Sequence, residues 1–295
     1  GSEMCIRDSL ASLVLPLELD TFAEAYKRAG YTTVAVSGNP IISVKTHFAQ
    51  GFDRFDEACM DRNLYRSAEC MTTRALEAIP EEGPVLLYIH YMDPHLPYIA
   101  PPPFLFSIRD MPFPASPGKL VKFVMDRYDE TIRYCDSEIG RLLEGLAARG
   151  ITDNSVIIIT ADHGEEMGEH GRFNHGNTVY EEVTHIPLVM AGTGVPAGVR
   201  VDYLTSGIDP YPTLLGIAGI KPPGKTSGVN LLPLRDTGRE WVISDLQGQT
   251  AFRTERYKLI VDAGSRRRML FDLLTDPVEQ HDLSEKEEAV LRDAY

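Results

Sequence analysis

Positive charge is scarce in this 295-residue chain, in which 43 acidic side chains outnumber 29 basic ones and give a formal net charge of −14. Surfaces that bind nucleic acid are usually basic. The composition therefore excludes extended binding of DNA or RNA. It does not exclude an anionic ligand in one pocket, because a metal ion and a few local cations can reverse the electrostatic field there.

Cysteine and long apolar runs are also scarce. The four cysteines include no Cys-x-x-Cys pair, so we expect no zinc finger and no disulfide framework, and we interpret them as small buried apolar residues. The apolar segment at residues 10–19 is short and is interrupted by Glu18. It is therefore neither a membrane span nor a convincing signal peptide.

Strand and helix signals alternate along most of the chain. Thr21 with Glu24 has the pattern of a capping box, and Gly30 follows the predicted helix as a C-terminal glycine. Apolar or β-branched runs predict strands, and apolar residues at helical spacing predict helices. The strands are predicted at residues 32–37, 85–91, 155–159 and 187–191, and the helices at residues 67–79, 119–149 and 212–218.

The pattern changes after Pro233, where shorter runs at residues 241–245, 250–254 and 257–261 predict a small antiparallel sheet. Alternation of strands and helices predicts an α/β fold with a mainly parallel sheet flanked by helices. We therefore divide the chain into a leader at residues 1–12, expected to be non-native or disordered, an α/β domain at residues 13–232 and a small-sheet subdomain with a tail at residues 233–295.

The strand predicted at residues 155–159 leads directly into Asp162 and His163, followed by Gly164. Ligands of α/β sheets bind beyond the carboxyl ends of strands. A carboxylate and an imidazole side by side at such a place can hold a metal ion, although a capping Asp and a hydrogen-bonded His in an ordinary turn would give the same dipeptide.

The wider sequence resembles the sulfatases of the alkaline phosphatase superfamily over about residues 19–284. The resemblance rests on ordered segments rather than on one motif, and it implies an alkaline-phosphatase-like fold with a small C-terminal sheet. The matching segments are residues 21–36, Gly51-Phe-Asp-Arg-Phe55, Asp93-Pro-His-Leu-Pro-Tyr98, Asp162-His-Gly-Glu-Glu-Met-Gly-Glu-His-Gly171 with residues 175–182 and 186–190, Asp209-Pro-Tyr-Pro-Thr-Leu-Leu215, and residues 253–260 with 270–279.

The resemblance implies roles for four residues. Asp162 and His163 match the family's second pair of metal ligands. Many sulfatases have Asp-Asn there and bind calcium, so we expect one divalent metal, with Ca²⁺ first and Mn²⁺, Mg²⁺ or Zn²⁺ as alternatives. The histidine favours a softer metal such as Mn²⁺ or Zn²⁺. His95 matches a histidine that contacts the sulfuryl group or protonates the leaving oxygen. His175 stands where many sulfatases place a substrate-binding Lys.

Two segments of the family have no match in this sequence. These are the strand that ends in paired aspartates and the Cys-x-Pro-Ser-Arg loop whose Cys or Ser becomes the formylglycine nucleophile. Cys5-Ile-Arg-Asp-Ser9 lacks that order. We expect the chain to lack roughly its first hundred residues, so no nucleophile is assigned and formylglycine is expected in the intact parent alone.

The sequence therefore predicts a fragment of a sulfuric ester hydrolase that acts on a small-molecule or carbohydrate sulfate ester and is inactive as given. Two alternatives remain: a phosphodiesterase or phosphonate monoester hydrolase of the same superfamily, and a catalytically silent sulfatase-like binding protein. Compartment and oligomeric state are not predicted.

Other polar residues are interpreted as structural. His90 is expected to be a hydrogen-bonded core residue, and Asp209 to cap the helix that follows it. For Glu166 and His170, a structural role is favoured over a place in the lining of the site. Asn39 stands where some sulfatases carry a Lys and a His near the substrate.

Overall fold

The computed structural model describes residues 5–6, 14–59, 68–105, 117–234, 236 and 238–285. The chain divides into two compact units, Leu13–Ser155 and Val156–Tyr295 with Gly1–Ser12, and each is described by itself. Most of the predicted leader lies outside the described residues. The division predicted at residue 233 stays a prediction.

The unit Leu13–Ser155 begins with the predicted capped helix. Helix α1 (Phe22–Arg28) has Thr21 as its N-cap, whose hydroxyl accepts from the Glu24 N–H, while the Glu24 carboxylate accepts from the Thr21 N–H at 2.8 Å. Gly30 takes a φ of 89°, which a glycine adopts without the steric cost of a side chain. The capping box and the helix end are thus confirmed.

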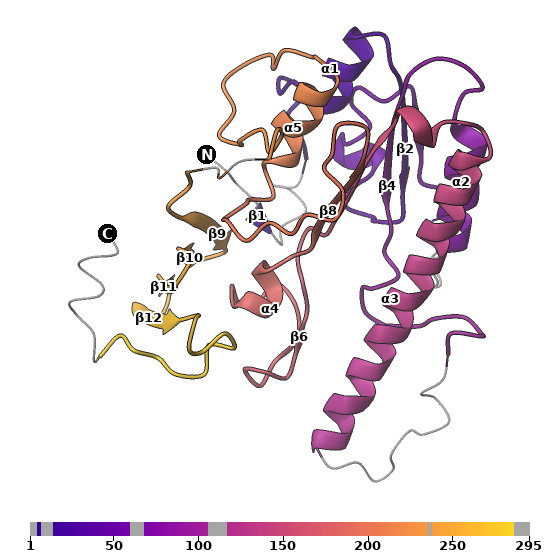
Figure 1. Cartoon of the computed structure of the whole chain (residues 1–295). Helices are drawn as coiled ribbons and strands as arrows, with labels where there is room; N and C mark the ends of the chain where they lie inside the picture. The colour runs from indigo at the N-terminus through magenta and orange to yellow at the C-terminus, as the bar shows by residue number, and fades with distance from the viewer. Residues whose placement is uncertain are drawn as a thin grey trace. The chain divides into compact units, whose positions relative to one another are not determined.

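The sheet of this unit is parallel, with strand order β3-β2-β4. Its strands are β3 (Arg54–Asp56), β2 (Thr32–Ser37) and β4 (Val85–His90). Helix α2 (Ala68–Ala78) packs on one face and α3 (Pro117–Ala147) lies beside α2 (Figure 1). The core there joins Val36 of β2, Met71 of α2 and Leu142 of α3.

The opposite face of the β4 strand is covered by aromatic rings. Tyr88 has Phe22 of α1 and Phe52 at centroid distances of 6.3 and 6.4 Å. Successive side chains of a strand point to opposite faces. A strand covered on both faces therefore reads as a continuous apolar run, which is how β4 appears in the sequence.

The cysteines correct one expectation. Cys59 and Cys70 form a disulfide that ties the segment after β3 to helix α2, whereas Cys135 is a buried free thiol. The expectation of buried small apolar residues holds for Cys135 and is wrong for the pair. Their separation of 11 residues resembles no framework motif, and their proximity comes from the packing of α2 on the sheet.

The second unit contains β5 (Val156–Thr160), which pairs antiparallel with β8 (Leu188–Gly192). Between them lie the β6 (Glu166–Met167) and β7 (Phe173–Asn174) hairpin and the short helix α4 (Glu181–Thr184). Helix α5 (Pro210–Ile217) follows. The described part of the chain contains no helix with the length and apolarity needed to cross a membrane.

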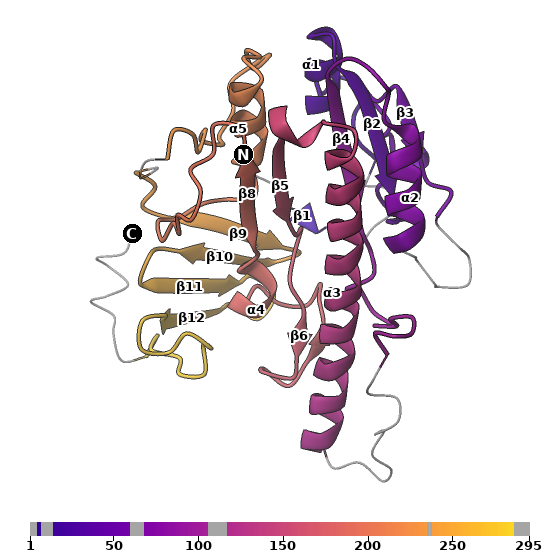
Figure 2. The same ribbon diagram turned by 45° about the vertical axis from the view of Figure 1, so that its right-hand side comes forward.

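The small C-terminal sheet has strand order β1-β9-β10-β11-β12 (Figure 2). Strands β9 to β12 run antiparallel to their neighbours, as predicted, and β1 (Cys5–Ile6) adds to β9 in parallel. The bounds are Val242–Leu246, Gln249–Arg253, Tyr257–Asp262 and Arg267–Asp272. Strand β12 was not among the predicted ranges.

Asp209 corrects a second expectation. It occupies the N-cap position of α5, but its side chain makes no capping hydrogen bond. The fully buried carboxylate instead accepts from Arg239 at 2.8 and 2.9 Å and from the backbone N–H groups of Ser206 and Val229. It therefore joins three loop segments.

Candidate metal and substrate site

The candidate site begins where β5 ends. The β-branched residues of β5 form the strand, and the chain then turns through Asp162 and His163 into Gly164. The Gly164 N–H donates to the Val183 carbonyl at 2.8 Å, and a Cβ at Gly164 would overlap the Glu182 carbonyl oxygen. The missing side chain lets this turn lie directly against α4.

His163 is oriented by its own backbone. Its Nδ1 lies 2.9 Å from the Gly164 carbonyl oxygen. A carbonyl only accepts, so Nδ1 carries the proton and Nε2 presents a lone pair. That Nε2 lies 3.8 Å from Asp162 Oδ2, less than the sum of two metal–ligand bonds of about 2.1–2.4 Å each. One cation can therefore contact both predicted ligands.

His175 reaches the same place from the β6–β7 hairpin. Its ring lies against that of His163, with the centroids 3.8 Å apart. Its Nδ1 lies 2.7 Å from Oε1 of Glu165, whose side chain is only 5% exposed. His163, Glu165 and His175 each offer a ligand atom, and these atoms lie within 4.8 Å of one another. We call these three residues the His–Glu–His cluster.

Glu165 was not among the predicted site residues. It lies two residues after His163, and in the structure the Gly164 turn is followed by the β6–β7 hairpin. Such a turn returns the chain so that Glu165 and His175, ten residues apart, become neighbours. Nothing in the sequence distinguishes Glu165 from its neighbour Glu166 as a site residue.

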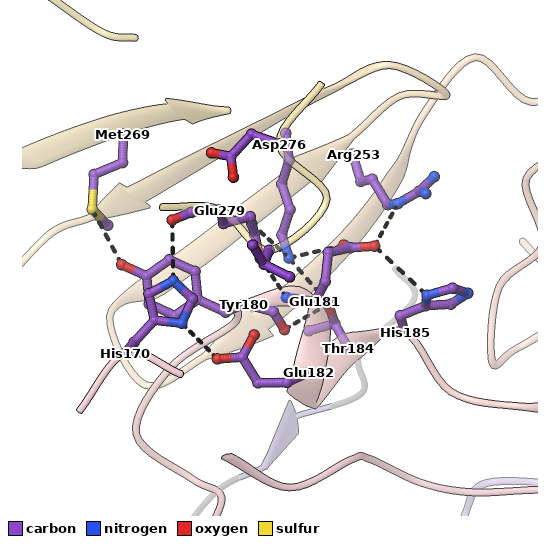
Figure 3. A network of polar contacts seen from close by, with 12 residues as sticks. His170, Tyr180, Glu181, Glu182, Thr184, His185, Arg253, Met269, Asp276 and Glu279 are labelled. Atoms are coloured by element: carbon purple, nitrogen blue, oxygen red, sulfur yellow. Dashed lines mark hydrogen bonds and ion pairs between the residues drawn. The ribbon is translucent and has the colours of Figure 1, made fainter. Parts of the chain in front are cut away.

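A polar network fixes the far side of the hairpin loop (Figure 3). His170 Nδ1 donates to Glu182 Oε1 at 2.6 Å, its Nε2 lies 3.0 Å from the Glu279 carbonyl oxygen, and its ring stacks on Tyr180 at 3.7 Å. Burial lowers the pKa of His170, but the hydrogen bonds and negative charge of Glu279 and Glu182 outweigh it and raise that pKa.

The same network encloses a lysine. Lys258, 1% exposed, contacts Glu181 at 3.0 Å and Glu279 at 3.2 Å. Burial raises the pKa of Glu181, yet the positive charges of Lys258 and Arg253 outweigh it and hold that pKa below its usual range. The loop that carries His170 is thus tied to the C-terminal segment by charged groups.

His95 belongs to the other unit, in the loop after β4. Its backbone N–H donates to the Met92 carbonyl and its Nδ1 donates to the Leu96 carbonyl at 2.7 Å, so the orientation of the ring is fixed. Asp93 accepts from the Ala68 N–H and ties the start of this loop to α2.

His90 is hydrogen-bonded at both ring nitrogens, as expected. Tyr88 Oη lies 2.9 Å from Nδ1, and the Asn39 amide nitrogen lies 3.2 Å from Nε2. Asn39 therefore helps to hold this half-buried histidine in place.

Comparison with known proteins agrees with this architecture. A family model described as Sulfatase matches residues 10–220, and one described as N-sulphoglucosamine sulphohydrolase, C-terminal, matches residues 168–292. Arylsulfatase K of Bos taurus is 31% identical over 187 residues, which are 57% of this chain and 34% of the relative. The uncharacterized sulfatase YidJ of Escherichia coli (strain K12) is 26% identical over 259 residues, 73% of this chain and 51% of the relative.

Solved structures share the fold at low identity. BT4656 in complex with its substrate D-glucosamine-2-N,6-O-disulfate has a TM-score of 0.78 at 19% identity, covering 97% of this chain and 81% of that one. The phosphonate monoester hydrolase of Agrobacterium radiobacter has a TM-score of 0.77 at 20% identity, covering 96% and 79%. The chain spans about a third of the length of the arylsulfatase K relatives. With the family model matching well over half of its residues, the chain belongs to the sulfatase family.

Proposed function

We propose that this chain carries the second metal-ligand pair and two substrate-contacting histidines of a sulfuric ester hydrolase. The observation that supports this most directly is the His–Glu–His cluster beside Asp162 at the end of β5. Asp162 and His163 would hold the metal, His175 would contact the substrate, and His95 would contact the sulfuryl group or the leaving oxygen.

The donor set fits a divalent metal. Asp162 and Glu165 offer carboxylate oxygen, while His163 offers a nitrogen whose orientation is already fixed by Gly164. Imidazole nitrogen suits Mn²⁺ or Zn²⁺ better than Ca²⁺, which prefers oxygen alone. We therefore place Mn²⁺ and Zn²⁺ level with Ca²⁺ here. When bound, such an ion neutralises the non-bridging oxygens of a sulfate ester.

The histidines would bind and protonate the substrate. Glu165 accepts the Nδ1 proton of His175, so the orientation of this ring is fixed, and the ring would contact an oxyanion of the substrate. His95, with Nδ1 on the Leu96 carbonyl, would in its protonated form donate from Nε2 to the leaving oxygen.

A carbohydrate sulfate is the substrate class that we propose. The supporting observations are the match of residues 168–292 to a model named for N-sulphoglucosamine sulphohydrolase and the likeness to BT4656, a protein solved with a sulfated glucosamine. An alternative is phosphonate monoester hydrolysis, which the likeness to the Agrobacterium radiobacter enzyme supports.

These 295 residues contain no match to the aspartate pair or to the Cys-x-Pro-Ser-Arg segment. We therefore propose that this polypeptide alone does not turn over a sulfate ester. Metal-dependent hydrolysis of 4-nitrophenyl sulfate by the purified chain would refute this part. The gene sequence upstream of Leu13 tests the reaction class. An Asp-Asp strand end followed by Cys-x-Pro-Ser-Arg would support the sulfatase, and an unmodifiable Thr or Ser at that place would support phosphoryl transfer. Absence of both elements would support a binding protein.

Metal binding is testable on the chain itself. Because the first metal-ligand pair has no match in this sequence, we expect weak binding at most. Titration calorimetry with Mn²⁺ and Zn²⁺ should show one weak site that is lost in Asp162→Asn and His163→Ala. His185→Ala, which removes a histidine whose side chain is 76% exposed, is the matched control and should bind like the unaltered chain. Equal affinities for all four proteins would remove Asp162 and His163 from the metal site.

A further inference from the structure

Glu166 has a buried carboxylate that takes no part in the site described above. The residue is 0% exposed, and within the described residues neither Oε1 nor Oε2 has a hydrogen-bond partner. A buried carboxylate normally has a cation or several donors, because removing the charge from water is otherwise very unfavourable. Such a side chain is expected to have a ligand.

Further oxygen atoms lie on the same side of the hairpin. Glu166 of β6 is paired with Asn174 of β7 in the antiparallel register. Directly opposed residues of such a pair project to the same face, with Cβ atoms about 5 Å apart. Asn174 Oδ1 is also buried and has no hydrogen-bond partner among the described residues. Asn174 takes a φ of 74°, an unusual conformation for a residue with a side chain.

Thr178 adds a third side chain. It is 5% exposed, and its hydroxyl lies near the Glu166 carboxyl. The hydroxyl is not aligned for a hydrogen bond with that carboxyl or with another group in the described part of the chain. Glu166, Asn174 and Thr178 thus supply four buried oxygen atoms and no nitrogen lone pair. We propose that these three residues form a Ca²⁺ site, separate from the His–Glu–His cluster.

Burial raises the pKa of the Glu166 carboxyl, and no cation of the described residues is hydrogen-bonded to it. Arg172 and His170 lie close enough to act on Glu166 electrostatically, but His170 donates its protons to Glu182 and to the Glu279 carbonyl. Arg172 is an exposed residue and makes no hydrogen bond to Glu166. Glu182, the neighbouring carboxylate, is bound to His170.

The chemistry of the donors selects the ion. Carboxylate, amide and hydroxyl oxygens are hard ligands, which suit Ca²⁺ or Mg²⁺ rather than Zn²⁺. Ca²⁺ accepts irregular geometry and a bidentate carboxylate, with waters completing its shell, whereas Mg²⁺ demands a near-ideal octahedron. A two-residue strand pair joined by a short loop is better suited to the less demanding ion.

The test uses the whole chain after chelator treatment, with Ca²⁺ alone as the probe. Calorimetry and thermal unfolding should show Ca²⁺ binding and a rise in melting temperature with Ca²⁺ concentration. Glu166→Gln, which keeps the shape and removes the charge, should lower the Ca²⁺ affinity at least about tenfold because ligand charge sets affinity at such sites. Glu255→Gln, at an exposed position, should leave it unchanged.

A second pair of variants separates this site from the proposed catalytic metal. His163→Ala should keep the Ca²⁺ binding that Glu166→Gln weakens, even if it removes Ca²⁺ from the Asp162–His163 site. Glu166→Gln should keep the Mn²⁺ binding that His163→Ala removes. If Glu166→Gln fails to fold, Thr178→Val, of the same shape without the hydroxyl, should still weaken Ca²⁺ binding. No Ca²⁺ binding, an affinity unaffected by Glu166→Gln and Thr178→Val, or loss of Ca²⁺ binding in His163→Ala would overturn the proposal.

Discussion

Glu165 Oε1 lies 2.7 Å from His175 Nδ1, and the carboxylate is almost completely enclosed. A hydrogen bond in such surroundings is stronger than one in water and sets the orientation of the ring. The His175 ring in turn lies on that of His163. The geometry of the candidate site therefore depends on a residue that was not predicted to belong to it.

Replacing this carboxylate should weaken metal binding. Glu165 offers a carboxylate oxygen to the cluster and holds the His175 ring against that of His163. Changes in the groups that support a metal site typically cost 10- to 100-fold in affinity, so Glu165→Gln should lower the Mn²⁺ affinity by about that factor. Titration calorimetry measures it, with Glu255→Gln as the exposed control. If the two variants bind Mn²⁺ equally well, Glu165 has no part in holding the site.

Gly164→Ala should destabilise the second unit. The added Cβ would overlap the Glu182 carbonyl oxygen, a backbone atom that cannot move aside without displacing α4. Overpacking of this kind typically costs about 1–3 kcal/mol, and a backbone obstacle places the change at the upper end. Urea unfolding of Gly164→Ala and Gly224→Ala makes the comparison, since a Cβ at Gly224 meets open space. Equal midpoints would show that the turn can relax.

Lys258→Met should be among the most destabilising substitutions in the chain. Removal of the ammonium leaves Glu181 with Arg253 and, at 4.0 Å, His185, and it takes away the cation that contacts Glu279. Breaking a buried ion pair by removing one partner typically costs about 3–5 kcal/mol. Lys122→Met is the control, because the exposed Lys122–Asp126 pair is expected to contribute about 0.5 kcal/mol or less. Similar unfolding free energies for the two variants would contradict the role given to Lys258.

Stability should depend on pH through His170. Its pKa is raised in the folded chain, so the stabilisation is complete below the unfolded pKa of about 6.5 and is lost as the pH rises through the folded value. The unfolding free energy should therefore fall on going from pH 6 towards pH 8, and His170→Gln should remove this part of the slope.

The groups around His170 that enter this dependence are Glu182, the Glu279 carbonyl, Tyr180 and the Gln280 amide at 3.4 Å. The measurement is urea unfolding at several pH values for the unaltered chain, His170→Gln and the exposed His185→Gln. An identical slope in all three would show that His170 does not change its protonation on unfolding.

Local signals were sufficient for the elements that position the site. The Thr21–Glu24 capping box and the β-branched run of β5 depend on neighbours in the sequence, and both were predicted within a residue or two. The pairing of β5 with β8 could not be read in the same way. An apolar run specifies a strand buried on both faces and carries no information about its direction, and these two strands proved antiparallel.

Contacts between residues that are distant in the sequence could not be predicted. The Asp209 carboxylate sits one residue before a helix and so has the signature of a cap, yet Arg239, 30 residues later, binds it. The disulfide of Cys59 and Cys70 likewise arises because α2 packs on the sheet. In both cases a local rule competed with a partner brought in by the tertiary fold. The metal and substrate roles of Asp162, His163, His175 and His95 remain proposals.

The tie between Glu279 and the α4 segment also sets an order of events during synthesis. Glu279 follows Glu181 by 98 residues, and Lys258 follows it by 77. At translation rates of roughly 5–20 residues per second, Glu181 leaves the ribosome about 5–20 s before its last partner. The loop carrying His170 therefore waits, without its final anchor, until nearly the whole unit has emerged. A premature stop codon before Glu279 would leave the buried Lys258 with Glu181 as its carboxylate partner and would remove the Glu279 carbonyl that His170 contacts.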